Sequence, residues 1–149
     1  MKHSERYLEG LARLARKAAR HMLKEKNLHD SMRVAAVCLY GSAAQFYFGH
    51  IEKYKDLDLQ IFLRRMPGYR QSAFARLKRR GAPWKIGEYD GKKVEAFFGL
   101  LQAEAPSDLV EAICLYISNH NSPRWIGHRT KPFLILWPMR VDWLRAGEG

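Results

Sequence analysis

Residues 33–42 read RVAAVCLYGS, an apolar run that ends at a Gly-Ser pair. A run of Val, Ala and Leu without polar alternation is typical of a central strand that is buried on both faces. Glycine followed by serine indicates a turn, and a strand that ends at glycine lets a phosphate approach the backbone. The sequence therefore predicts a central strand over residues 33–40 and a turn at Gly41-Ser42.

Further strands are predicted on both sides of this run. Residues 56–63 alternate polar and apolar side chains until the apolar end of the run, which places Asp56 and Asp58 on one face of a strand. Residues 84–89 and 92–101 form two strand-like runs, and Asp90-Gly91 between them suits a tight hairpin turn. Residues 133–137 predict a further strand that Pro138 closes.

Helices are predicted where apolar residues recur every three or four positions. Ser4 can cap a helix that continues to about residue 24, residues 69–80 predict a second helix, and residues 106–108 open a third. Residues 141–144 are expected to dock as a last turn. Together these elements predict a single domain over residues 1–149 of the α/β (α+β) class, with a small mixed sheet of about four to five strands and helices packed on it.

The composition excludes several classes of protein. The chain has 149 residues, a net charge of +11 and 47% hydrophobic residues, which is enough to build one core. Its only cysteines, Cys38 and Cys114, lie in apolar segments and predict two buried thiols in a reducing cytoplasm. No apolar run is long enough to span a membrane, and no signal peptide is expected. The charge favours an acidic partner without separating RNA, DNA, nucleotides or an acidic protein.

Three carboxylates are the candidate catalytic and metal-binding residues. Asp56 and Asp58 lie two positions apart on one strand, a spacing that suits a shared Mg²⁺ ion. Glu95 is an isolated acid in an apolar strand and therefore needs a partner. If the two strands are neighbours, the three acids can hold two metal ions, an arrangement that performs phosphoryl transfer.

The order of these motifs resembles a known family. Residues 39–42 (Leu-Tyr-Gly-Ser), followed by residues 56–59 (Asp-Leu-Asp-Leu), are similar to the signature of the nucleotidyltransferase superfamily typified by DNA polymerase beta, and to its minimal members in size. The resemblance implies a nucleotidyltransferase-like palm and an enzyme that transfers NMP, with AMP from ATP the first expectation, to a hydroxyl of RNA or protein with release of pyrophosphate. It also implies Mg²⁺ or Mn²⁺ at Asp56, Asp58 and Glu95, and phosphate binding at Gly41 and Ser42.

Basic residues give a second set of candidates. Seven cations without an acid occupy residues 64–80, directly after the Asp56 strand, so Arg64 and Arg65 are expected to help hold the triphosphate. A solvated helix is an equal alternative for this segment. The residues that could contact a nucleic acid or a partner protein are Arg16, Arg20, Arg76, Arg79 and Arg80.

The expected partners are a nucleoside triphosphate with either an RNA, such as a tRNA end, or a helical partner protein. The resemblance permits a role in a toxin–antitoxin pair, and a homodimer stays open. The alternative hypothesis is a noncatalytic basic module, for example an antitoxin component, that binds nucleic acid or a partner and retains the fold.

Overall fold

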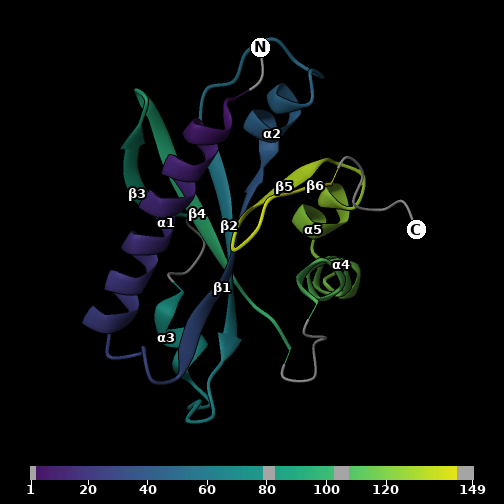
Figure 1. Ribbon diagram of the computed structural model, residues 1–149. Helices are drawn as coiled ribbons and strands as arrows, with labels where there is room; N and C mark the ends of the chain where they lie inside the picture. The colour runs from purple at the N-terminus through teal and green to yellow at the C-terminus, as the bar shows by residue number, and fades with distance from the viewer. Residues whose placement is uncertain (1–2, 79–82, 103–107, 144–149) are drawn as a thin grey trace.

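A six-stranded mixed sheet with helices on both faces forms the centre of the protein (Figure 1). The computed structural model describes residues 3–78, 83–102 and 108–143. In chain order the elements are α1 (Glu5–Glu25), β1 (Met32–Tyr40), α2 (Gly41–Tyr47), β2 (Leu57–Arg65), α3 (Ala73–Leu77), β3 (Trp84–Tyr89), β4 (Lys92–Leu100), α4 (Leu109–Asn119), α5 (Pro123–His128), β5 (Phe133–Trp137) and β6 (Val141–Trp143). The predicted fold class is confirmed, with one correction. The sheet has six strands rather than four to five, because residues 141–143 pair with β5 as a strand instead of docking as a turn.

The strands lie in the order β3-β4-β2-β1-β5-β6. β1 is antiparallel to both β2 and β5, whereas β2 and β4 are parallel neighbours. β3 and β4 form the predicted hairpin, and Asp90 and Gly91 both have positive φ angles, of 54° and 74°, as a two-residue hairpin turn of this type requires. The parallel pair brings the strand that carries Glu95 directly beside the strand that carries Asp58.

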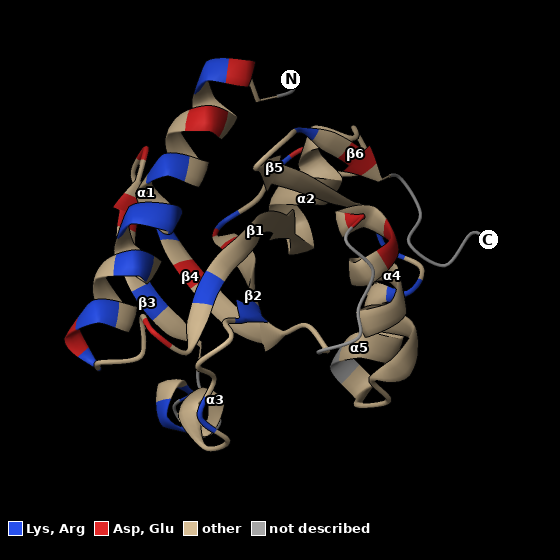
Figure 2. Ribbon diagram, turned by 60° about the horizontal axis from the view of Figure 1, so that its bottom comes forward, with Lys and Arg blue, Asp and Glu red and all other residues tan. Residues whose placement is uncertain are grey.

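α1 covers one face of the sheet. Ser4 caps this helix as predicted, since its hydroxyl accepts a hydrogen bond from the Tyr7 amide. The apolar stripe of α1 packs against the β1 and β2 side chains that point to this face, among them Val37, Leu39 and Leu59. Lys and Arg residues recur along the length of α1 (Figure 2). The buried members of the stripe are Leu8, Leu11, Ala12, Ala15, Ala19 and Leu23.

α4 and α5 cover the opposite face. Phe62 of β2 lies between Tyr116 of α4 and Trp125 of α5, with ring centroids 5.1 and 6.4 Å away. Cys38 and Tyr40 of β1 belong to this second core. Because successive residues of β1 enter different cores, the strand has to be apolar at nearly every position, which explains the uninterrupted run in its sequence.

Three local predictions need correction. The helix expected over residues 69–80 is formed only over Ala73–Leu77 among the described residues, because residues 66–70 make a turn held to the α1–β1 connection: the Arg70 guanidinium donates to the Asn27 carbonyl. The helices α2 and α5 were not predicted. Both cysteines are free, but Cys114 is only half-buried, whereas Cys38 is fully buried and burial raises the pKa of its thiol.

Among the residues that the structure describes, no helix is long and apolar enough to cross a membrane.

We expect the stability of the fold to depend on the protonation of His3. Its ring stacks on Tyr7 with centroids 4.5 Å apart and contacts Phe46 and Tyr54, and burial lowers the pKa of His3 below its ordinary value of 6.5. The unfolded chain therefore takes up this proton at a higher pH than the folded chain, so the contribution to stability is lost as the pH falls below about 6.5. Urea unfolding between pH about 7 and about 5 should show a smaller loss of stability in His3→Phe than in wild type.

The matched control for this titration is His50→Phe, since His50 is exposed whereas His3 is half-buried. This control should keep the pH dependence of the wild type. Equal pH dependence in wild type and His3→Phe would contradict the assignment.

Candidate active site

The junction of β1 and α2 places the Gly-Ser pair against a carboxylate. Gly41 has a φ of 68°, in the left-handed region that glycine adopts without strain. A Cβ atom at Gly41 would lie 2.9 Å from Oδ2 of Asp58, so the Gly41 backbone and the Asp58 carboxylate are close neighbours. Ser42 follows as the second residue of α2 and is half-buried. The fold thus brings together Gly41 and Asp58, which are distant in sequence.

The register of the sheet places Glu95 beside Asp58. In the parallel pair of β2 and β4, Asp58 is the partner of Glu95, and in the antiparallel pair of β1 and β2 it is the partner of Tyr40. Register partners in neighbouring strands point to the same face, about 5 Å apart. The two carboxylates therefore project side by side, and both are accessible because both are only half-buried.

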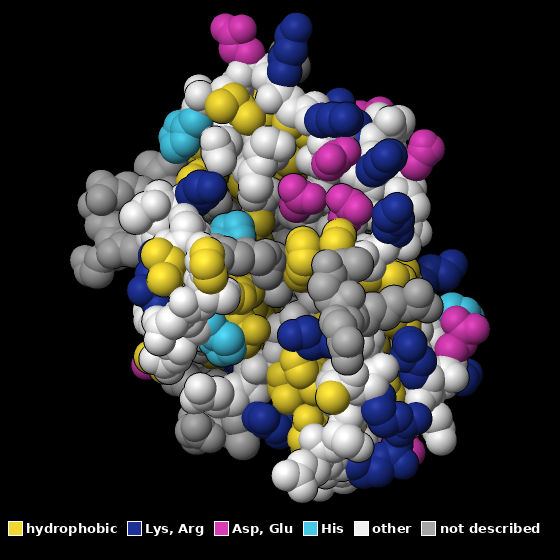
Figure 3. Space-filling model, turned by 180° about the vertical axis from the view of Figure 1, so that it is seen from behind, with side chains coloured by type: hydrophobic (Ala, Val, Ile, Leu, Met, Phe, Trp, Pro, Cys, Tyr) yellow, Lys and Arg dark blue, Asp and Glu magenta, His cyan; other side chains and the backbone are white. Residues whose placement is uncertain are grey.

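Tyr40 links this row of residues to the second core. Its ring stacks on Phe133 and contacts Trp125 and His128, with centroids 5.1, 6.2 and 4.8 Å away. Asp58 and Glu95 thus lie on the face of the sheet that α4 and α5 cover farther along the strands. Viewed from behind, acidic side chains gather in the upper part of the molecule (Figure 3).

Asp56 lies one residue before β2, since the strand begins at Leu57 rather than at Asp56. It is half-buried, and its position is outside the strand pairing that aligns Asp58 with Glu95. Within residues 3–78, 83–102 and 108–143, no three His, Cys, Asp or Glu side chains converge closely enough to hold a metal ion. Asp58 and Glu95 form a pair of neighbouring carboxylates, and a Mg²⁺ ion needs one or two carboxylates and completes its shell with substrate phosphates and water.

Arg64 and Arg65 do not lie at this site. They occupy the opposite end of β2, where their register partners are Arg33 and Met32. Six or seven residues of extended strand separate them from Asp58, which corresponds to about 20 Å. The Arg65 guanidinium donates to the Leu101 carbonyl instead. The expectation that these two arginines hold the triphosphate is corrected by this distance.

The other predicted basic residues are also away from the carboxylates. Arg76 is exposed on α3, and its guanidinium donates to the Lys26 carbonyl. Arg16 and Arg20 lie on α1 and line a groove beside β1. Arg79 and Arg80 lie outside the described residues.

Two residues that extend or contact the row of Tyr40, Asp58 and Glu95 were not predicted. Lys85 of β3 is the register partner of Glu95, so it extends the row of Tyr40, Asp58 and Glu95 by a cation. The two-residue hairpin turn would by itself place Ile86 opposite Glu95, and an irregularity between Lys85 and Gly87 shifts the pairing by one residue. The other residue is His128, which reaches Tyr40 only through the packing of α5.

Searches of this chain against protein families, curated proteins and solved structures return no match. The residues of the site and their geometry are therefore the basis for its function.

Gly41→Ala tests the contact between the Gly-Ser junction and Asp58. We expect this substitution to lower the free energy of unfolding by about 2–4 kcal/mol, since the residue must adopt a positive φ and its methyl group meets the Asp58 carboxylate. Gly49→Ala is the matched control, because Gly49 has a similar φ of 78° and open space around it. Urea unfolding should show a loss for Gly49→Ala that is smaller by about 1 kcal/mol or more. Equal losses would contradict the close contact.

Proposed function

We propose that the protein is a Mg²⁺-dependent nucleotidyltransferase that transfers NMP, with AMP from ATP as the first donor to test, to a hydroxyl of an RNA or protein. The observation that carries the proposal is the pairing of Asp58 with Glu95 across β2 and β4, with Asp58 against the Gly41 backbone. Two aligned carboxylates beside a glycine that admits a phosphate suit this reaction class.

Each residue has a defined role in the proposal. Asp58 and Glu95 would hold the metal ion, which when bound polarises phosphate oxygens and offsets their charge. The acceptor oxygen forms a bond to the α-phosphorus while the bond to pyrophosphate breaks, and the proton of the acceptor hydroxyl passes to a carboxylate of the pair. Gly41 and Ser42 would contact the phosphates through the backbone and the serine hydroxyl. Lys85, the register partner of Glu95, would contact the triphosphate from the β3 side.

The location of the reaction and its acceptor also belong to the proposal. Free thiols at Cys38 and Cys114 support a reducing cytoplasm. The net charge of +11 supports an acidic acceptor. The salt dependence of binding tests whether this acceptor is an RNA, because each phosphate contact makes binding more sensitive to salt.

The direct test combines binding and turnover. Each common ribonucleoside triphosphate, labelled at the α-phosphate, is incubated with the protein, Mg²⁺ or Mn²⁺, and total cellular RNA, and both pyrophosphate and label on macromolecules are measured. We expect one of these nucleotides to be transferred in preference to the others, and we expect no transfer after the metal is chelated. A nonhydrolysable triphosphate is titrated in parallel. If the folded protein shows no pyrophosphate release and no Mg²⁺-dependent binding of the analogue, the proposal is refuted.

A second candidate function is a nucleic-acid-binding module without catalysis. The observation in its favour is the basic groove along α1, which lies apart from the carboxylates. Nucleic-acid binding without any turnover or triphosphate binding would select this second function.

A further inference from the structure

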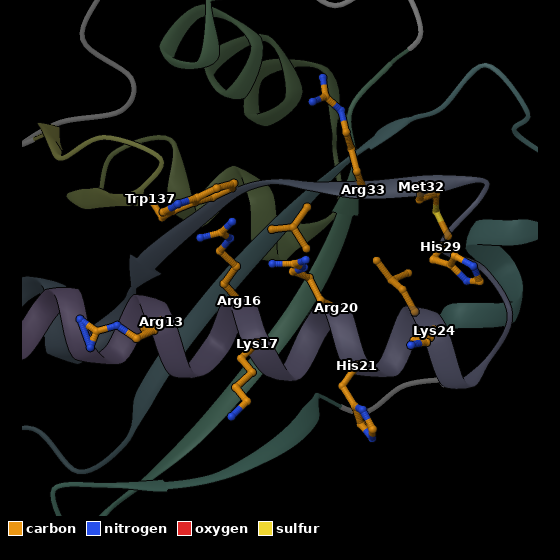
Figure 4. Close-up of a pocket in the computed structure, with 12 residues that line it drawn as sticks. Arg13, Arg16, Lys17, Arg20, His21, Lys24, His29, Met32, Arg33 and Trp137 are labelled. Carbon is orange, nitrogen blue, oxygen red and sulfur yellow. The ribbon is translucent and has the colours of Figure 1, made fainter.

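A groove of about 770 Å³ lies between α1, the first residues of β1 and the end of β5 (Figure 4). Arg16 and Arg20 point from α1 toward β1 and Trp137, whereas Lys17 and His21 point to the other side of the helix. Its lining residues are Arg13, Arg16, Lys17, Arg20, His21, Leu23, Lys24, His29, Met32, Arg33, Val34 and Trp137.

The groove exists because β5 is shorter than β1. β5 pairs only with Val37, Cys38 and Leu39 of β1, and after Trp137 the chain turns back to form β6. Within the described part of the sheet, residues 32–36 of β1 therefore have no strand beside them on this side. α1 continues past this point to Glu25, so the helix forms one wall of the hollow and the open edge of β1 forms the other.

The lining of the groove is strongly cationic. Six of its residues are Lys or Arg, and no Asp or Glu of the described residues is among them. The two carboxylates near the end of α1, Glu25 and Asp30, contact His21 and His29 at 3.0 and 3.5 Å rather than these cations. Within the described chain, no ion pair joins the lining Lys and Arg residues to a carboxylate. The groove thus holds a positive charge that a bound anion would offset.

The cations are spaced along the helix so that one extended anion can contact several of them. Arg13, Arg16, Arg20 and Lys24 follow one another at three or four residues, and they span about 16 Å of helix. Neighbouring cations at this spacing repel each other by about 0.2–0.5 kcal/mol per pair, and bound phosphates relieve that repulsion. A single small anion would leave most of the row without a counterion.

The groove also has a flat surface on which a base can stack. The Arg16 guanidinium carbon lies 4.2 Å from the centroid of the Trp137 ring. Trp137 is half-buried, and its ring and the stacked guanidinium border the groove. Aromatic rings and planar guanidinium groups are the surfaces on which single-stranded nucleic acids stack their bases.

We propose that this groove binds a single-stranded nucleic acid, with its phosphates along the α1 cations and a base against Arg16 and Trp137. The inference stands independently of the proposed nucleotidyl transfer, because the groove shares no residue with the carboxylate site. A row of cations, a stacking surface and an opening of this size favour a single strand. An acidic peptide that adds to the open edge of β1 is the competing occupant, and the experiment separates the two.

The test measures the fluorescence anisotropy of labelled oligouridylate, oligothymidylate, a duplex of the same length and polyglutamate, with the full chain at several salt concentrations. We expect the single strands to bind more tightly than the duplex and polyglutamate. Arg16→Glu/Arg20→Glu should weaken single-strand binding by about tenfold or more. It should also reduce the magnitude of the slope of log affinity against log salt by about 0.7 or more, because each phosphate contact contributes about 0.7 and the proposal assigns Arg20 to a phosphate and Arg16 to a base. The single variant Arg20→Glu, at an exposed position, should weaken binding in the same direction.

The matched control is Lys93→Glu/Lys131→Glu, which changes the net charge equally at two exposed positions outside the groove. It should retain nearly the affinity of the wild type. Three outcomes would each overturn the proposal. The control weakens binding as much as the groove variants do, both groove variants bind like the wild type while their circular dichroism is native, or polyglutamate binds more tightly than the oligonucleotides. Asp58→Asn should bind the oligonucleotides like the wild type, so a failure of the catalytic proposal is distinguishable from a failure of this one.

Discussion

Asp58→Asn is expected to lower the rate of the proposed nucleotidyl transfer by at least about 10³-fold while the fold persists. The substitution keeps the size of the side chain and removes its charge beside Gly41 and opposite Glu95. A carboxylate that holds a metal ion against a triphosphate contributes several kcal/mol to the transition state, and each 1.36 kcal/mol is a factor of ten in rate. Pyrophosphate release under saturating Mg²⁺ and triphosphate measures the effect.

Asp30→Asn is the matched control for this experiment. Asp30 is exposed, contacts His29 and lies before β1, away from the carboxylate row. Removal of the Asp30 charge should leave the rate within about twofold of the wild type, since a surface ion pair contributes little to the stability of the fold. Glu95→Gln should resemble Asp58→Asn. If Asp58→Asn retained the wild-type rate, the carboxylate pair would not be the catalytic centre.

Phe62→Ala is expected to lower the free energy of unfolding by about 3–5 kcal/mol, because it removes a buried aromatic ring and leaves a cavity. Phe62 is fully buried between Tyr116 and Trp125. It also packs on Gly99 of β4, where an added Cβ would lie 3.1 Å from the Phe62 ring. The side chain therefore joins the sheet to α4 and α5. Urea unfolding monitored by circular dichroism measures the change.

The control for the second core is Leu115→Ala. Leu115 lies on α4 and is 44% exposed, so its truncation removes little buried surface and should cost less than about 1 kcal/mol. A loss below about 1 kcal/mol in Phe62→Ala would contradict the packing of α4 and α5 on the sheet. The slope of stability against urea should stay constant if both variants unfold in one step.

Local sequence patterns were sufficient to predict much of the secondary structure. The stripe of α1 and its Ser4 cap, the apolar run of β1, and the hairpin turn at Asp90-Gly91 all depend on residues that are close in sequence. The predictions failed where a distant contact decided the conformation. Residues 66–70 form a turn because they are held to Ser31 and Asn27, and residues 141–143 became a strand because β5 was available to pair.

Some residues of the candidate site could likewise be identified from the sequence, whereas others depend on the tertiary structure. Asp58, Glu95 and Gly41 could be selected from residue type and spacing, and the position of Arg64 and Arg65 at the far end of β2 could have been foreseen from the length of the strand. The pairing of Lys85 with Glu95 could not be predicted from the sequence, because it depends on a shift of one residue in the pairing of β3 with β4.

The sequence by itself determined α1, β1, the β3–β4 hairpin and which of their faces are apolar, because periodicity, capping and turn chemistry act over a few residues. Only the tertiary structure decided that β4 lies parallel beside β2, that Glu95 therefore faces Asp58, and that β5 stops short to leave a basic groove along α1. Strand order and register depend on how two cores on opposite faces are filled at once, and that requirement couples residues throughout the chain.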